Sequence, residues 1–211
     1  SRNSPISAKL VANLIATAGA HRVLTLDLHS PAIEGFFDIL VDHLRATPLL
    51  ARRYRQMVHG NNVVAVSPDA GGVARANDFR ARVGAPLAII SKHHPDVDTT
   101  EVIEMVGDVE GKTCVIVDDF ISTGGTLVEA ANMLRERGAA EVHVAATHGI
   151  FAGNAISLME SSPSSKVFVT DSIPLPVGEA PEMIEKITIA PLLAEAIMRI
   201  HKDLSVSALF H

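Results

Sequence analysis

Two adjacent carboxylates, Asp118 and Asp119, stand after an apolar run and just before a turn rich in hydroxyl groups and glycine. The turn consists of Ser122, Thr123, Gly124, Gly125 and Thr126. Carboxylates accept hydrogen bonds from vicinal hydroxyls, and N–H groups at the start of a helix bind phosphate. This order of residues therefore predicts a sugar-phosphate site. The turn lacks Gly-Lys-Ser/Thr, which argues against nucleoside triphosphate binding by the turn itself.

A purely structural interpretation of the same segment is a strand-to-helix turn in which Gly124 and Gly125 relieve backbone strain. It does not explain why Asp118 and Asp119 stand side by side, because two like charges repel each other. Such a pair points to a metal or a polyhydroxyl partner. We therefore interpret the segment as functional.

Further polar segments also follow apolar runs. They are 27–29 with His29, 67–72 with Asp69, and 91–95 with Lys92 and His94. Taken alone, a histidine after a strand is more often structural than catalytic, and a loop lysine is usually only solvated. In a parallel sheet, however, ligands gather at the carboxyl ends of the strands, which makes these segments candidates for binding.

The elements that must position these residues alternate along the chain. Helices are predicted at 5–18, 48–58, 73–83, 127–137, 154–160 and 191–201. Strands are predicted at 23–28, 63–66, 87–90, 113–117, 142–147, 166–170 and 187–189, with a small hairpin or flap formed by 101–106 and 107–112. Repeated strand–loop–helix units predict an α/β fold with parallel sheets flanked by helices.

The composition excludes several classes of protein. The formal net charge of −6 argues against non-specific nucleic-acid binding. No apolar stretch approaches the ~20 residues that span a bilayer, so no membrane association is expected. The single cysteine, Cys114, lies in an apolar run, which favours core packing over a reactive thiol and a reducing, cytoplasmic location.

The segment 115–127 resembles the phosphoribosyl-binding signature shared by type I phosphoribosyltransferases and ribose-phosphate diphosphokinases (PRPP synthetases). The segment 27–37, Asp-Leu-His-Ser-Pro-Ala-Ile-Glu-Gly-Phe-Phe, resembles a signature of the second family alone. The segments 5–9, 106–112 and 190–210 match that family as well. The chain therefore resembles a ribose-phosphate diphosphokinase over nearly its whole length.

This resemblance implies a role for each candidate residue. Lys92 would be catalytic, and His29 would contact ATP. Mg²⁺ would be bound by His29 and Asp69. Ribose 5-phosphate would be bound by His94, Asp118, Asp119, Ser122, Thr123, Gly124, Gly125 and Thr126.

The resemblance also implies an activity and an organisation. The diphosphoryl group of Mg-ATP would pass to the 1-hydroxyl of ribose 5-phosphate, giving PRPP and AMP for nucleotide biosynthesis. Two tandem phosphoribosyltransferase-like domains are expected: 1–91 on the metal and ATP side, incomplete at its N-terminus, and 92–190 on the ribose 5-phosphate side. The tail 191–211 would pack back on the first domain. A homo-oligomer is implied, since the family forms hexamers.

The chain departs from the family pattern at several positions. His94 stands where the family has an arginine, Ser122 replaces an aspartate, and Ala32 replaces a glutamine. The chain begins at Ser1 without a methionine, and nothing corresponds to the family's N-terminal segment. We expect a truncated chain that is inactive alone. Two alternatives stay open: a non-catalytic regulatory subunit of a PRPP synthetase assembly, and a type I phosphoribosyltransferase.

Overall fold

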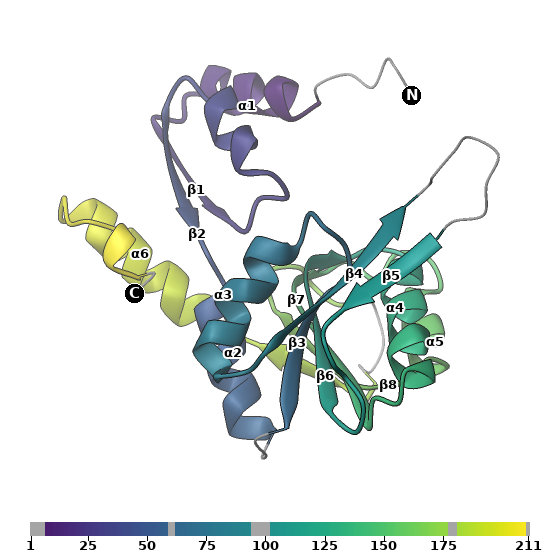
Figure 1. Ribbon diagram of the computed structural model, residues 1–211. Helices are drawn as coiled ribbons and strands as arrows, with labels where there is room; N and C mark the ends of the chain where they lie inside the picture. Colours follow the sequence, from purple (N-terminus) through teal and green to yellow (C-terminus); the bar gives the residue numbers. More distant parts are fainter. Residues whose placement is uncertain (1–6, 59–61, 94–101, 177–180, 210–211) are drawn as a thin grey trace. The chain divides into compact units, whose positions relative to one another are not determined.

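The computed structural model describes residues 7–58, 62–93, 102–176 and 181–209. The chain forms two compact units (Figure 1). Unit 1 combines Ser1–Ala46 with Ala190–His211, and unit 2 is Thr47–Ile189. Each unit is built around its own sheet, and each is described by itself.

Unit 1 contains a two-stranded parallel sheet with helices from both ends of the chain. Its elements are α1 (Ser7–Thr17), β1 (Arg22–Leu26), the 3-10 helix η1 (Pro31–Phe36), β2 (Leu40–Leu44), α6 (Ala190–His201) and the 3-10 helix η2 (Ser207–Leu209). Leu192, Ala196 and Ile200 recur at helical spacing, so α6 presents one apolar stripe to the core around Leu44.

Unit 2 is a seven-stranded sheet with helices on both faces. Its strands are β3 (Val63–Ser67), β4 (Leu87–His93), β5 (Val102–Val106), β6 (Thr113–Ile121), β7 (Glu141–Gly149), β8 (Ser164–Thr170) and β9 (Ile184–Ile187). Its helices are α2 (Thr47–Met57), α3 (Val73–Val83), α4 (Gly125–Glu136) and α5 (Ala155–Glu160). The strand order is β5-β4-β3-β6-β7-β8-β9, and only β5 runs antiparallel to its neighbour among these strands.

The order of the strands reverses direction between β3 and β6. From β3 the chain moves outward to β4, whereas from β6 it moves the opposite way to β7, β8 and β9. The helices α2 and α3 therefore cover one face, while α4 and α5 cover the other (Figure 1). The central run Cys114–Val117 is buried throughout, as expected for a strand covered on both faces. A reversal of this kind opens a crevice at the carboxyl ends of the two strands, where α/β proteins bind ligands.

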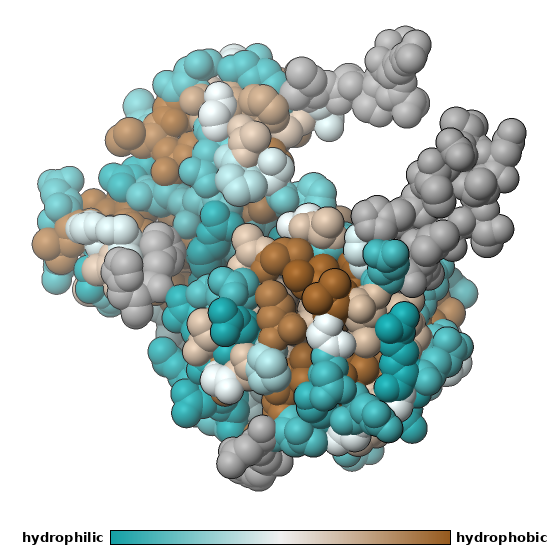
Figure 2. Space-filling view, in the orientation of Figure 1, coloured by the Kyte–Doolittle hydropathy of each residue, from teal (hydrophilic) through white to brown (hydrophobic). Residues whose placement is uncertain are grey.

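Apolar side chains gather on the face of unit 2 seen in Figure 2, among hydrophilic neighbours. The edge strand β5 contributes to the apolar surface of unit 2 through Val106, which is 68% exposed. None of the helices described here has the length and apolar character that a bilayer crossing requires.

The predicted α/β class with parallel strands and flanking helices is confirmed, but some local predictions were wrong. The last strand, predicted at 187–189, is β9 at Ile184–Ile187. The sequence prediction omitted β2. The hairpin of 101–106 with 107–112 does not form, because β5 pairs with β4 and the second segment turns into β6 instead. At that turn Gly107 has a φ of +111°, and a Cβ there would lie 2.8 Å from the Cβ of Ala88.

The two units differ from the predicted domains 1–91 and 92–190. The strands β3 and β4 hydrogen-bond into the sheet that also holds β6 to β9, so they belong to unit 2. The tail Ala190–His211 belongs to unit 1 with Ser1–Ala46.

Candidate sugar-phosphate site

The two aspartates lie near the carboxyl end of β6, at the reversal of strand order. Asp119 is buried, with a residue exposure of 3%, and the side chain of Asp118 is 22% exposed. Oδ1 of Asp118 accepts the N–H of Asp119 at 2.9 Å, and Oδ1 of Asp119 accepts the N–H of Phe120 at 3.1 Å. The backbone therefore helps to orient both carboxylates.

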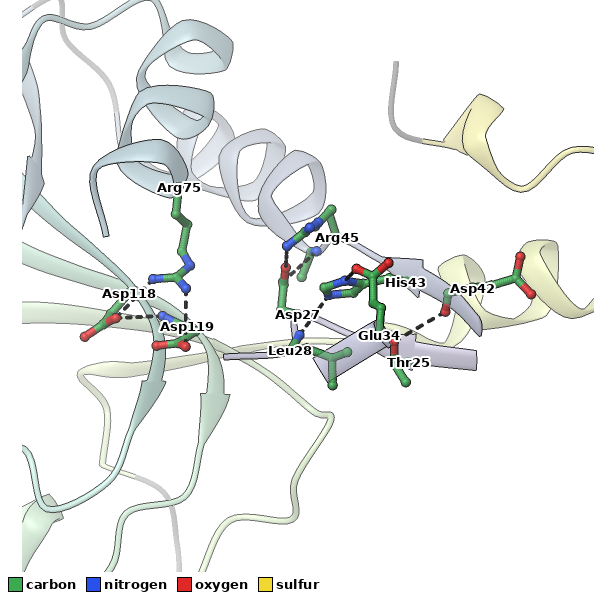
Figure 3. A network of polar contacts seen from close by, with 11 residues as sticks. Thr25, Asp27, Leu28, Glu34, Asp42, His43, Arg45, Arg75, Asp118 and Asp119 are labelled. Atoms are coloured by element: carbon green, nitrogen blue, oxygen red, sulfur yellow. Dashed lines mark hydrogen bonds and ion pairs between the residues drawn. The ribbon is translucent and has the colours of Figure 1, made fainter. Parts of the chain in front are cut away.

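Arg75, from the first turn of α3, forms ion pairs with both aspartates (Figure 3). Its Nη1 lies 3.2 Å from Oδ1 of Asp118, and its Nη2 lies 3.3 Å from Oδ2 of Asp119. The sequence analysis did not single out this arginine. The predicted helix carries three arginines, and the sequence alone does not show which of them faces the aspartates. Only the packing of the helix against the sheet shows that it is Arg75.

Burial changes the ionisation of this pair. It raises the pKa of Asp118 to about 7, and contact with Asp119 adds to the rise, whereas Arg75 opposes it. Two close carboxylates titrate as a pair, and each disfavours the ionised form of the other. Asp118 therefore keeps its proton to higher pH than an isolated aspartate does.

The turn at 122–126 connects the aspartates to α4. Gly124 is buried and has a φ of +81°, a left-handed conformation that favours glycine. Among the described residues, no side chain caps the start of α4, which leaves its first N–H groups available to a ligand. Ser122 is partly exposed, whereas Thr123 and Thr126 are exposed. This geometry suits a phosphate at the N-terminus of a helix.

A loop from the end of β7 holds the turn in place. The N–H groups of Ile150 and Phe151 donate to the carbonyl of Ile121 at 3.0 and 3.1 Å. The N–H of Ala152 donates to the carbonyl of Ser122 at 3.0 Å. These backbone hydrogen bonds from 150–152 hold the start of the turn at 122–126.

Asp69 follows β3, the strand beside β6, and is exposed. Its Oδ1 accepts the N–H of Gly72 at 2.8 Å, and Ser67 Oγ donates to its carbonyl at 2.7 Å. A Cβ at Gly72 would lie 2.9 Å from Oγ of Ser67, so the loop is tightly closed there. These contacts hold the carboxylate at the carboxyl edge of the sheet, where Asp118 also lies.

The oxygen donors of this edge fit one kind of metal site. Within the described ranges, no three His, Cys, Asp or Glu side chains stand close enough to hold a metal by themselves. Mg²⁺ is commonly bound through one or two carboxylates, waters and substrate phosphates rather than by a protein cage. The exposed carboxylate of Asp69 fits that pattern.

His29 belongs to unit 1 and is exposed. The segment that carries it is fixed by polar contacts (Figure 3). Oδ2 of the buried Asp27 accepts the N–H of Ala46 at 2.8 Å, and the N–H of Leu28 donates to Nε2 of His43 at 2.8 Å. His43 in turn pairs with Glu34 through Nδ1. The backbone on the N-terminal side of His29 is thus held by the hydrogen bonds of Asp27 and Leu28.

Lys92 and His94 are the other two predicted residues. Lys92 is on β4, and its backbone is in register with Ile103 of β5. Its side chain is not among those the structure describes, and His94 lies outside the described residues altogether. Their roles stay predictions.

The structure brings together three of the predicted groups within unit 2: the aspartate pair, the phosphate turn and the loop of Asp69. They place carboxylates and the start of a helix at one edge of the parallel sheet of an α/β protein. A family model described as "Phosphoribosyl synthetase-associated domain" matches residues 88–211. The chain belongs to this family.

Curated relatives extend the match over nearly the whole chain. A ribose-phosphate pyrophosphokinase of Caldanaerobacter subterraneus subsp. tengcongensis is 51% identical over 98% of this chain and 65% of its own length. That of Aquifex aeolicus is 50% identical over 98% of this chain and 66% of its own length. The chain thus spans about two thirds of the length of these relatives, and the resemblance to ribose-phosphate diphosphokinases is confirmed.

A solved structure supports the same fold. The phosphoribosylpyrophosphate synthetase from Mycobacterium smegmatis superimposes with a TM-score of 0.88 at 40% identity. The match covers 95% of this chain and 65% of the other.

Proposed function

We propose that the protein transfers the diphosphoryl group of Mg-ATP to the 1-hydroxyl of ribose 5-phosphate, giving PRPP and AMP. The observation that carries this proposal is the aspartate pair placed directly before the uncapped start of α4, at the reversal of strand order. About 50% identity to ribose-phosphate pyrophosphokinases supports the same reaction.

The acceptor sugar would lie along β6 and the turn that follows it. The N–H groups of the turn 122–126 would bind the 5-phosphate, with the hydroxyls of Ser122, Thr123 and Thr126 as further donors. Asp118 and Asp119 would accept hydrogen bonds from the ring hydroxyls. This arrangement fixes the sugar at two points and so leaves the 1-hydroxyl in one orientation.

In the reaction, the oxygen of the 1-hydroxyl bonds to the β-phosphorus of ATP. The bond from that phosphorus to the bridging oxygen of AMP breaks, and the hydroxyl proton is released. Little covalent work falls to the protein, since alignment and charge neutralisation carry the rate of phosphoryl transfer. Lys92 would place its ammonium group against the transferring group.

Two residues from the sequence analysis would serve the metal and ATP. Asp69 would hold Mg²⁺, and His29 would contact ATP and the metal. Mg²⁺ held there would neutralise charge on the ATP phosphates. His94 would contact ribose 5-phosphate, although neutral imidazole lacks the bidentate fork that a guanidinium group offers phosphate.

The proposal also covers the substrates, pathway, cellular location and oligomeric state of the protein. ATP and ribose 5-phosphate would be its small-molecule partners, nucleotide biosynthesis its pathway, and the cytoplasm its location. Cys114 is buried, and burial raises the pKa of its thiol to about 11, which keeps the thiol unreactive. A homo-oligomer is part of the proposal, as in the family.

The test is a phosphorus-31 NMR assay of the protein, including any residues encoded before Ser1, with Mg²⁺, ATP and ribose 5-phosphate. We expect AMP and PRPP to appear in equal amounts. AMP without PRPP would indicate hydrolysis, and neither product would contradict the proposed function.

A regulatory subunit is the second candidate, and the histidine at position 94 favours it. The variant His94→Arg separates the two. A large gain in PRPP formation indicates an enzyme with weakened sugar binding, whereas no gain in a protein that still binds ribose 5-phosphate indicates the regulatory role.

A further inference from the structure

Arg75 makes an unusual pair of contacts for a residue outside the sugar-phosphate motif. Its two terminal nitrogens reach two different carboxylates, one on Asp118 and one on Asp119. The side chain of Arg75 is 21% exposed and that of Asp119 only 4%. The contact is therefore largely withdrawn from water, where a charge interaction is stronger than at the surface.

Few other charged side chains on the described parts of the neighbouring elements lie near the two aspartates. β3 carries no charged residue between Val63 and Ser67, and on β7 the titratable group at this edge is His148, in register with Phe120. The other described arginines of α3 bond within their own helix: Arg80 to Asn77 and Arg82 to Asp78. Arg75 is thus the arginine of α3 that faces the aspartates.

The contacts also fix the direction of one carboxylate. Arg75 and the N–H of Asp119 both bind Oδ1 of Asp118. Figure 3 shows the second oxygen of Asp118 pointing away from Arg75. The second oxygen of Asp118 can therefore accept a hydrogen bond from a sugar hydroxyl, while Oδ1 keeps its contact with the guanidinium group of Arg75.

We propose that Arg75 is a positioning residue for the sugar site, which orients Asp118 and Asp119 as acceptors for the vicinal hydroxyls of ribose 5-phosphate and favours their ionised form. This inference rests on the proposed function for its substrate. The planar fork of arginine matters, because a lysine ammonium is a single point that does not bridge two carboxylates in the same way.

The first test compares Arg75→Gln and Arg75→Lys with the matched control Arg80→Gln, which changes the same charge on the same helix. Binding of ribose 5-phosphate is measured by calorimetry at several pH values around neutrality. Without the arginine, the pair holds its proton to higher pH. A rise of about one unit in the pKa of Asp118, from about 7, leaves roughly a tenth of this carboxyl ionised at pH 7 instead of half, so we expect about fivefold weaker binding of Arg75→Gln at that pH.

The pH profile distinguishes positioning from simple structural support. The pH at which affinity is half lost should move upward in Arg75→Gln, less in Arg75→Lys, and not at all in Arg80→Gln. An unchanged affinity, or a loss that is equal at every pH, would overturn the proposal.

A second measurement needs no sugar. Carbon-13 NMR of the aspartate carboxyl groups reports the pKa of Asp118 directly, and we expect it to rise in Arg75→Lys and, if that variant folds, in Arg75→Gln. An unchanged pKa overturns the inference. If the unmodified protein fails to bind ribose 5-phosphate while this pKa rises as expected, the proposed function fails and the role of Arg75 in the ionisation stands.

Discussion

The hydroxyl of Tyr54 on α2 lies 2.9 Å from Nδ1 of His143 on β7, and both side chains are about 1% exposed. Tyr54 also packs edge-on against Phe79 and Phe168, with ring centroids 5.6 and 5.2 Å away. This contact joins α2 to the sheet on the face opposite α4. The polar pair is therefore part of the core that keeps β6 and its aspartates in place.

Tyr54→Phe should lower the stability of the protein with little change in packing. The ring remains, but Nδ1 of His143 loses its partner inside the core. We expect a loss of about 1–3 kcal/mol in the free energy of unfolding, the usual penalty for an unsatisfied buried polar group. Urea unfolding followed by circular dichroism measures it, and a variant as stable as the unmodified protein would contradict it.

His143 should also make stability depend on pH. Burial lowers its pKa below the ordinary value near 6.5, although Glu141 at 3.3 Å from Nε2 opposes the shift. As the pH falls below about 6.5, the unfolded chain takes up a proton on this histidine before the folded protein does. Stability therefore falls with pH in this range.

The measurement compares the variant His143→Gln with the unmodified protein between pH 7 and pH 5. Glutamine does not titrate, so the variant should lose less stability on acidification. The exposed His201 offers the control His201→Gln, which should follow the unmodified protein. Parallel curves for all three proteins would show that His143 does not drive the effect.

The sequence predicted the main helices and strands that carry the candidate site, including α3 and β6. The range of α3 was predicted as observed, because Val73, Ala76 and Phe79 recur at helical spacing before Gly84. β6 was predicted for its apolar run 113–117 and proved longer, since its hydrogen bonds to β7 continue to Ile121. Local patterns thus located the strand that carries the aspartates.

The missing parts depend on contacts between distant residues. β2 contains Asp42 and His43, whose polarity hides the strand, and their partners Arg22 and Glu34 become visible only in the fold. Arg75 is one of several arginines on its helix, and sequence alone does not show which of them faces the sheet. The sequence analysis missed both β2 and Arg75, because ion pairs between residues far apart in the sequence produce no periodic pattern of residue types.

Asp118→Asn should stabilise the protein while weakening its site. The pKa of Asp118 is about 7 in the folded protein, above its ordinary value of 3.8, so the folded state holds its proton more tightly than the unfolded chain. The stability that this carboxyl contributes therefore falls as the pH rises from about 4 to 7. Asparagine removes that penalty.

We expect Asp118→Asn to gain on the order of 1 kcal/mol in the free energy of unfolding at pH 8, and less at pH 5. Binding of ribose 5-phosphate should weaken at the same time, because the amide offers one acceptor fewer. The control is Asp108→Asn, where Lys112 lowers the pKa of an exposed carboxyl and no gain is expected. An Asp118→Asn protein no more stable than the original at pH 8 would refute this.

Gly149→Ala should disturb the phosphate turn from outside it. A Cβ at Gly149 would lie 2.6 Å from a ring carbon of Phe151, which is buried and has a left-handed φ of +46°. The ring must move, and the backbone that donates to Ile121 and Ser122 moves with it. We expect a loss of about 1–3 kcal/mol in stability, typical of overpacking in a core.

The effect on the site should be specific to the phosphate group. Gly149→Ala should weaken binding of ribose 5-phosphate severalfold, whereas ATP binding, measured separately by calorimetry with Mg²⁺, should change little, since the loop supports the turn at 122–126. Gly35→Ala is the matched control, because a Cβ at Gly35 meets no atom within 4 Å. Equal weakening of both ligands in Gly149→Ala would indicate a general loss of structure, and unchanged sugar-phosphate affinity would show that the loop at 150–152 does not hold the turn.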